Sequence, residues 1–279
     1  MREPPELPPK DDAVGPQAGD DAAGDSPGHP ITGGNGRANS RLRDTVLGRR
    51  GPGGPLLVAF ITVSIATALS WLLPEAHAAT GVGLAFLGAT YLSVLRDGDT
   101  RTVRESGLSL GGLFEAEPLS LRRSLRSAAG ALAWAAASVA LLFPAFWLGF
   151  LLWHSPAAAF APASLRELWG DVGGQLLGVA FPEELFFRGY LQSALDRALP
   201  PRLRVLGAKL GPGLLISSAV FAAGHLSTDP HPARLAVFFP SLAFGFLRAR
   251  SGGVGAAIVF HAACNLFASY LGRSYGLFP

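Results

Sequence analysis

Two adjacent glutamates and an arginine stand among phenylalanines and leucines in the stretch FPEELFFRGYLQSAL, which begins at Phe181. Glu184 and Arg188 are four residues apart, so a helix places them on one face, in the order that favours an ion pair. Glu183 lies about 100° further round and is free to point elsewhere. Such groups cost about 2.5–3.5 kcal/mol each at mid-membrane and usually face a polar cavity. A salt-bridged helix end at an interface is the alternative interpretation.

Two further apolar segments carry isolated polar groups. His225 stands near the end of LLISSAVFAAGHL, and His261 and Asn265 are four residues apart in VGAAIVFHAACNLFASYLG. Taken alone, a histidine near a helix end is often structural, and a His–Asn pair is a common hydrogen-bonded link between helices. Taken with the glutamates, these groups supply a base, a polarising group and an amide donor, which the hydrolysis of a peptide by water requires.

The composition indicates a membrane protein. Of 279 residues, 49% are hydrophobic and only 15% are charged, against about 25% in soluble domains. The formal net charge of +3 is modest and the arginines lie mostly between apolar runs, which excludes a nucleic-acid-binding face. The single cysteine excludes an internal disulfide.

Several apolar runs are long enough to cross a bilayer as a helix, which takes roughly 20 residues. We therefore expect an all-α fold, a polytopic transmembrane helical bundle of about seven spans. Six or eight are the alternatives, because polar residues interrupt the fourth and fifth runs. The expected spans cover about residues 55–74, 78–95, 128–153, 165–199, 212–226, 235–247 and 254–271.

Basic residues crowd before the first run, between the second and third, after the fourth, and between the sixth and seventh. The positive-inside rule then predicts a cytoplasmic N-terminus and a C-terminus on the other side. Residues 1–50 are rich in Pro, Gly, Asp and Ala without apolar periodicity, which predicts a disordered tail. No apolar signal-peptide core occurs within the first thirty or so residues.

The three polar segments resemble the motifs of the CAAX protease and bacteriocin-processing family of intramembrane proteases, also called the CPBP or Abi family. Its pattern is EExxxR, then FxxxH, then HxxxN or HxxxD. Here EELFFR begins at Glu183, FAAGH at Phe221 and HAACN at His261. The order agrees, no motif position departs from the pattern, and the resemblance covers about residues 165–271. The first three spans are matched by hydropathy alone.

The resemblance implies an intramembrane endopeptidase of the glutamic type and a role for each motif residue. Glu183 is expected to be the general base that activates a water, and His225 to bind and polarise the same water. His261 and Asn265 are expected to stabilise the oxyanion of the tetrahedral intermediate. Because partial burial raises the pKa of a carboxyl group and makes it a better base, we expect a water-filled cavity open to one side.

The resemblance further implies that Glu184 and Arg188 hold the site, with Arg188 also able to anchor substrate. With composition and hydropathy, it divides the chain into a tail (1–50), an N-terminal transmembrane part with a basic cytoplasmic loop (51–160) and a catalytic transmembrane part (161–279). The expected partners are the lipid bilayer and a membrane protein or peptide. Prenylated termini, bacteriocins and sorting tails are the substrate types of such proteases, and the arginine-rich composition favours a bacterial plasma membrane.

Several alternatives remain open. Glu183, His225 and His261 could bind zinc as a His₂Glu site, although the sequence lacks HExxH and no cofactor is expected. Cys264 could be a nucleophile, but a small buried thiol fits its place better. A non-proteolytic membrane binding or immunity protein could use the same polar cluster, and a proton-coupled transporter could use buried Glu and His.

Overall fold

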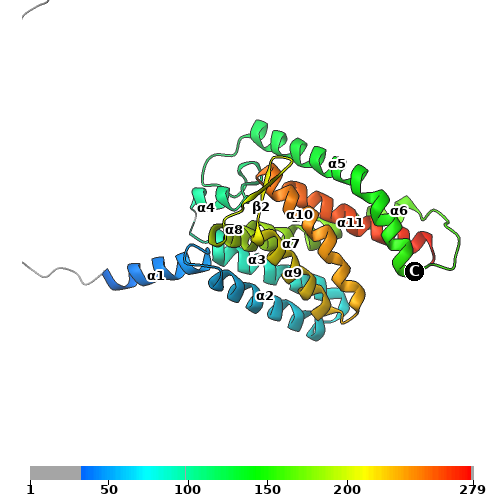
Figure 1. Ribbon diagram of the computed structural model, residues 1–279, viewed down its shortest axis with the longest axis horizontal. Coiled ribbons are helices and arrows are strands. Elements are labelled where there is room, and N and C mark those ends of the chain that lie inside the picture. The colour runs from blue at the N-terminus through cyan, green and yellow to red at the C-terminus, as the bar shows by residue number, and fades with distance from the viewer. Residues whose placement is uncertain (1–32, 98, 278–279) are drawn as a thin grey trace, which may run out of the picture.

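The structure is a computed structural model that describes residues 33–97 and 99–277. It is a bundle of helices, as expected, with one small exception (Figure 1). Strands β1 (Leu203–Val205) and β2 (Ala208–Leu210) form an antiparallel hairpin between two helices. The hairpin turns at Gly207, whose positive φ of 84° suits a residue without a side chain.

The helices follow one another through short connections at both ends of the bundle (Figure 1). In chain order they are α1 (Gly33–Val46), α2 (Gly53–Leu72), α3 (Glu75–Thr90), the π-helical η1 (Tyr91–Leu95), α4 (Thr100–Glu105), the short 3₁₀ helix η2 (Leu110–Gly112), α5 (Leu121–His154), α6 (Leu165–Gly173), η3 (Gly174–Ala180), α7 (Phe181–Glu184), η4 (Leu185–Gln192), α8 (Ser193–Ala198), α9 (Pro212–Thr228), the 3₁₀ helix η5 (Pro232–Val237), α10 (Phe238–Ser251) and α11 (Gly255–Ser274).

Four helices in the described part of the chain are long and apolar enough to cross a membrane. They are α2, α3 continued by η1, α5 and α11, and they coincide with the first, second, third and seventh expected spans. The other three expected spans are also helical, but α9 and α10 are shorter and the helix of residues 165–198 carries charges. The total of seven spans therefore stays a prediction.

Helix α5 is longer than a bilayer is thick. Its 34 residues span about 50 Å, whereas the hydrocarbon core measures about 30 Å. The excess lies at its N-terminal end, where Arg122, Arg123 and Arg126 precede the apolar stretch. Figure 1 shows α5 lying along α11. The rings of Phe143 in α5 and Phe267 in α11 stack on each other, with their centroids 4.2 Å apart.

The helix of residues 165–198 is continuous but irregular. Two π-helical segments, η3 and η4, flank the single α-helical turn α7. Pro182 lies in that turn and has no N–H to donate to the carbonyl of Gly178, so regular α-helical bonding is interrupted there. Such widened turns recur at functional sites. Helix α3 approaches closely, since a Cβ on Gly83 would lie 3.0 Å from the Gly178 carbonyl oxygen.

The same helix is buried along only half of its length. Every residue from Pro182 to Leu195 is buried, whereas Gly173, Gly174, Leu177 and Gly178 are exposed. The buried half packs against α3, α9 and α10. The glutamates of the EELFFR motif therefore stand at the point where the helix enters the interior.

The prediction of a disordered tail is wrong for residues 33–46, which form α1, and residues 1–32 lie outside the described part. Tertiary contacts explain the helix. Arg43 pairs with Asp97 and Asp99, each at 3.2 Å, and the Leu47 side chain just after α1 is fully buried. A composition argument misses these contacts because they come from a loop fifty residues away.

The basic loop between α3 and α5 also has internal order. The buried carboxylate of Glu115 accepts a hydrogen bond from Arg104 at 2.7 Å and others from Arg123 and Ser109. The guanidinium of Arg104, then that of Arg123, lowers the pKa of Glu115 to about 2. This cluster ties the loop to the start of α5.

We expect the substitution Glu115→Gln to lower the free energy of unfolding by about 2 kcal/mol at neutral pH, the scale of a hydrogen bond to a charged group. A carboxyl group whose pKa is depressed by folding stabilises the protein above its unfolded pKa, near 4.5, and loses that contribution as the pH falls toward 2. The difference between variant and wild type should therefore shrink below about pH 5. Unfolding in detergent as a function of pH measures it.

The control is Glu105→Gln, which removes the exposed pair with Arg101 and should change little. Equal losses for both variants, or a difference that persists at low pH, would contradict this account of Glu115.

Candidate active site

Glu184 and Arg188 form the expected ion pair, deep in the protein. The Nε of Arg188 lies 3.3 Å from Oε2 of Glu184, and both side chains are fully buried. Arg188 also donates to Ser241 of α10, at 2.7 Å to the hydroxyl and 3.0 Å to the carbonyl. Its guanidinium carbon lies 4.8 Å from the ring centroid of Phe221, a cation–π contact. The pair therefore joins the EELFFR helix to α9 and α10.

His261 of α11 lies between the two glutamates. Its Nδ1 is 2.9 Å from Oε1 of Glu184, and its Nε2 is 3.8 Å from Oε2 of Glu183. Because a carboxylate only accepts, Nδ1–H donates to Glu184, which orients the ring. The ring of Phe244 stacks on the imidazole at 4.6 Å and fixes its plane. His261 thus couples the first and third motifs directly.

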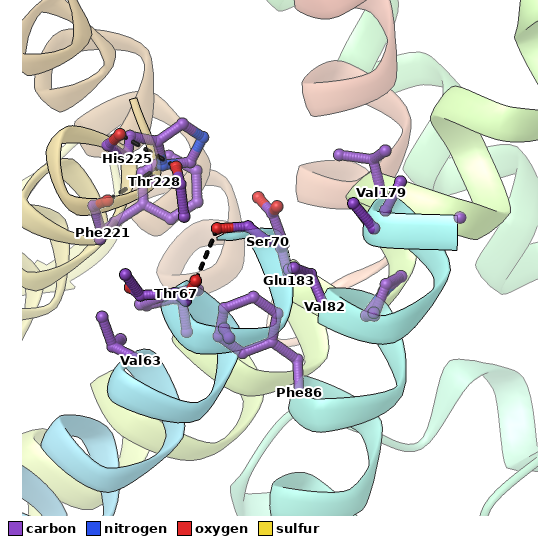
Figure 2. Close-up of a pocket in the computed structure, with 18 residues that line it drawn as sticks. Val63, Thr67, Ser70, Val82, Phe86, Val179, Glu183, Phe221, His225 and Thr228 are labelled. Carbon is purple, nitrogen blue, oxygen red and sulfur yellow. Dashed lines mark hydrogen bonds between the residues drawn. The ribbon is translucent and has the colours of Figure 1, made fainter. Parts of the chain in front are cut away.

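Glu183 and His225 face one cavity of about 260 Å³ between α2, α3, α9 and the helix of residues 165–198. Figure 2 shows the Glu183 carboxylate directed into the space between α9 and α3. Oε2 of Glu183 is buried and makes no hydrogen bond within the described residues. The lining is mainly apolar, with polar groups from Thr67, Ser70 and Thr228.

The imidazole of His225 is held by its own helix. Its Nδ1 lies 3.0 Å from the carbonyl oxygen of Phe221, one turn earlier. The carbonyl can only accept, so Nδ1 carries the proton and Nε2 of the neutral ring is an acceptor. Phe221 therefore has two tasks, since its backbone orients His225 while its ring covers Arg188.

Asn265 lies apart from this cavity. Its Nδ2 donates to Oε1 of Gln175 in η3 at 2.9 Å, and neither Asn265 nor His261 is among the residues that line the cavity. The structure thus joins Glu183, Glu184, Arg188 and His261 in one cluster and places His225 across the cavity. The oxyanion role expected for His261 and Asn265 stays a prediction.

The sequence analysis missed two residues that bond to motif side chains: Ser241, which bonds to Arg188, and Gln175, which bonds to Asn265. Ser241 stands alone in the apolar run FFPSLAFGFL, and Gln175 stands alone in GGQLLG. A single polar residue in an apolar helix indicates a buried contact, because such a residue needs a polar partner. The partner itself could not be named, since Ser241 is 53 residues from Arg188.

Glu183, His225 and His261, the residues considered for zinc, do not meet as a set of metal ligands. Within residues 33–97 and 99–277, no three His, Cys, Asp or Glu side chains are grouped so as to hold a metal ion. His261 uses Nδ1 for Glu184, and His225 uses Nδ1 for a backbone carbonyl. Cys264 is buried and stands outside the cavity lining.

Comparison with known proteins gives one family. The family model described as type II CAAX prenyl endopeptidase Rce1-like matches residues 165–267, the segment that carries all three motifs. Comparisons with curated proteins and with solved structures give no match. Together with four helices apolar enough to cross a bilayer, the match identifies an integral membrane protein. Residues 165–267 of this chain are thus similar to the Rce1-like type II CAAX prenyl endopeptidase family.

Proposed function

We propose that this protein is an intramembrane endopeptidase in which Glu183 activates the water that hydrolyses a peptide bond. One observation carries the proposal. Oε2 of Glu183 is buried without a hydrogen-bond partner in the described chain, and the Glu183 side chain lines the same cavity as the imidazole of His225. Charge is costly in such surroundings unless it is used or paired. Glu184 has Arg188 as its partner at 3.3 Å, whereas the salt-bridge contact of Glu183 within the described residues is the longer one of 3.8 Å to His261.

The reaction follows from general acid–base chemistry. Glu183 takes a proton from water while the water oxygen bonds to the carbonyl carbon of the substrate. His225 accepts a hydrogen bond from the same water through Nε2 and so orients it. The carbon–nitrogen bond of the tetrahedral intermediate then breaks, and Glu183 returns its proton to the leaving nitrogen. The products are a carboxylic acid and an amine, and no cofactor is needed.

The remaining motif residues position this base. His261, held by Glu184, contacts Glu183 at 3.8 Å, and Arg188 balances the charge of Glu184. The proposal keeps the oxyanion role for His261 and Asn265. For His261 it requires a second proton, on Nε2, because Nδ1–H donates to Glu184. For Asn265 it requires that substrate replace Gln175 as the acceptor of the amide N–H.

We expect Glu183→Gln to abolish cleavage, with a loss of about 10²-fold to 10⁴-fold in kcat, because the amide keeps the shape of the side chain but cannot take a proton. The measurement compares the protein fragments that wild type and variant release from membranes of the expressing cells. The thermal unfolding of both should agree, which separates chemistry from folding.

The matched control is Glu75→Gln, the same chemical change at the exposed start of α3. It should keep wild-type cleavage. A Glu183→Gln variant that cleaves as fast as this control would exclude Glu183 as the base.

We expect Arg188→Met to destabilise the fold by about 3–5 kcal/mol, because it leaves the carboxylate of Glu184 buried without its cation. The double variant Glu184→Gln, Arg188→Met should recover part of that loss, since both charges are then absent. Thermal unfolding of the two single variants and the double variant in detergent measures the coupling. Independent, additive losses would show that the pair contributes nothing as a pair.

A further inference from the structure

Most basic residues of the described chain lie at one end of the bundle, where contacts join distant segments. Arg43 pairs with Asp97, and Arg248 donates to the backbone carbonyl of Glu105 at 2.7 Å. Figure 1 shows α1, α4 and α8 together at this end. By the positive-inside rule it faces the cytoplasm. Its basic residues are Arg41, Arg43, Arg49, Arg50, Arg96, Arg101, Arg104, Arg122, Arg123, Arg126, Arg197, Arg202, Arg204, Lys209, Arg248 and Arg250.

Exposed tryptophans mark the opposite end. Trp71 and Trp153 lie at the C-terminal ends of α2 and α5, and Trp169 lies in α6, with exposed fractions of 63%, 54% and 74%. The end of α11 lies beside α6, where Arg273 pairs with Asp171 at 3.0 Å. Tryptophan is enriched where a membrane helix meets the headgroups. Because tryptophan is enriched at both interfaces, these residues mark where the bilayer ends, and the basic residues at the other end give the orientation.

The cavity lies on the tryptophan side of Glu183. Its outer lining comes from Ser70, next to Trp71, from Thr228, the last residue of α9, and from Ala78, in the first turn of α3. Along α2 it extends from Val63 to Ser70, about 10 Å. It therefore leads from the non-cytoplasmic end of the helices down to the glutamate.

The other side of Glu183 is closed. The next residues toward the basic end fill the interior, and Phe186, Arg188 and Tyr190 have no exposed surface. Arg188 is bonded to Ser241, and Tyr190 donates to the carbonyl of Val46 at 2.9 Å. A peptide cannot pass through this layer without breaking those bonds.

We propose that substrate reaches Glu183 from the non-cytoplasmic side of the membrane. The substrates are then membrane proteins or peptides cut in the segment that joins a transmembrane helix to its non-cytoplasmic flank. A terminus displayed only at the cytoplasmic surface does not meet the cavity. The proposal rests on the proposed proteolytic function for the nature of the ligand, but its direction rests on charge and burial alone.

Chemical labelling tests the direction without any turnover. In a Cys264→Ala background, which removes the single native cysteine, Ser70→Cys places a thiol at the cavity mouth and Leu203→Cys places one on the exposed hairpin at the basic end. Spheroplasts of expressing cells are treated with a membrane-impermeant maleimide before and after permeabilisation. We expect the thiol at position 70 to react in intact spheroplasts, and the thiol at position 203 to react only after permeabilisation.

The reverse pattern would overturn the direction of entry and leave the proteolytic function untouched. Reaction of both positions in intact spheroplasts would also overturn it, because the hairpin would then share the outer side. Thermal unfolding of each variant shows whether the fold is retained, and Thr228→Cys provides a second mouth position if Ser70→Cys fails to fold.

A second measurement tests the substrate class. Mass spectrometry of protein termini compares membranes from cells that express wild type with membranes from cells that express Glu183→Gln. The termini specific to wild type should lie on the non-cytoplasmic flank of a transmembrane helix. Termini on the cytoplasmic flank would overturn the direction of entry while supporting proteolysis. If the two sets of membranes show no difference, the proposed function is overturned, and the labelling experiment alone decides the direction.

Discussion

An ionised side chain loses its hydration when a helical bundle closes round it, and it keeps its charge only if another group compensates. This constraint shapes the centre of the protein. Arg188 and Glu184 are both fully buried and lie 3.3 Å apart, and Ser241 and the ring of Phe221 complete the surroundings of the guanidinium. With these two charges balanced, Glu183 is the carboxylate of the motif that faces the cavity.

The helix that carries these groups is adapted to the task. Pro182 and the flanking π-helical segments widen it where the glutamates stand, and the absence of a side chain at Gly83 lets α3 come within contact of that turn. Both features would weaken an isolated helix. Here the surrounding helices supply the packing that holds the irregular turn. The turn is less stable by itself than a regular α-helix, but it positions the two carboxylates.

The division of this helix into an open and a closed half gives the site a direction. Before Ala180 much of the helix is exposed, and from Pro182 to Leu195 none of it is. The proposed hydrolysis needs water and substrate at the cavity side of Glu183. The buried layer of Phe186, Arg188 and Tyr190 closes the other side, and the cavity beside Ser70 and Thr228 provides the access.

The sequence by itself determined the class of fold and named the residues of the candidate site. Hydropathy located α2, α3, α5 and α11 because a membrane helix must bury its backbone bonds in an apolar run of fixed length, and the spacing of Glu184 and Arg188 predicted their ion pair because it is local to one helix. Only the tertiary structure decided which groups meet: His261 with both glutamates, Ser241 with Arg188, and Gln175 with Asn265. It also showed that α1 is helical, because Arg43 finds its acidic partners in another loop. These contacts join residues 50 or more positions apart, and their distances depend on how the helices pack, which periodicity and spacing along one chain do not encode.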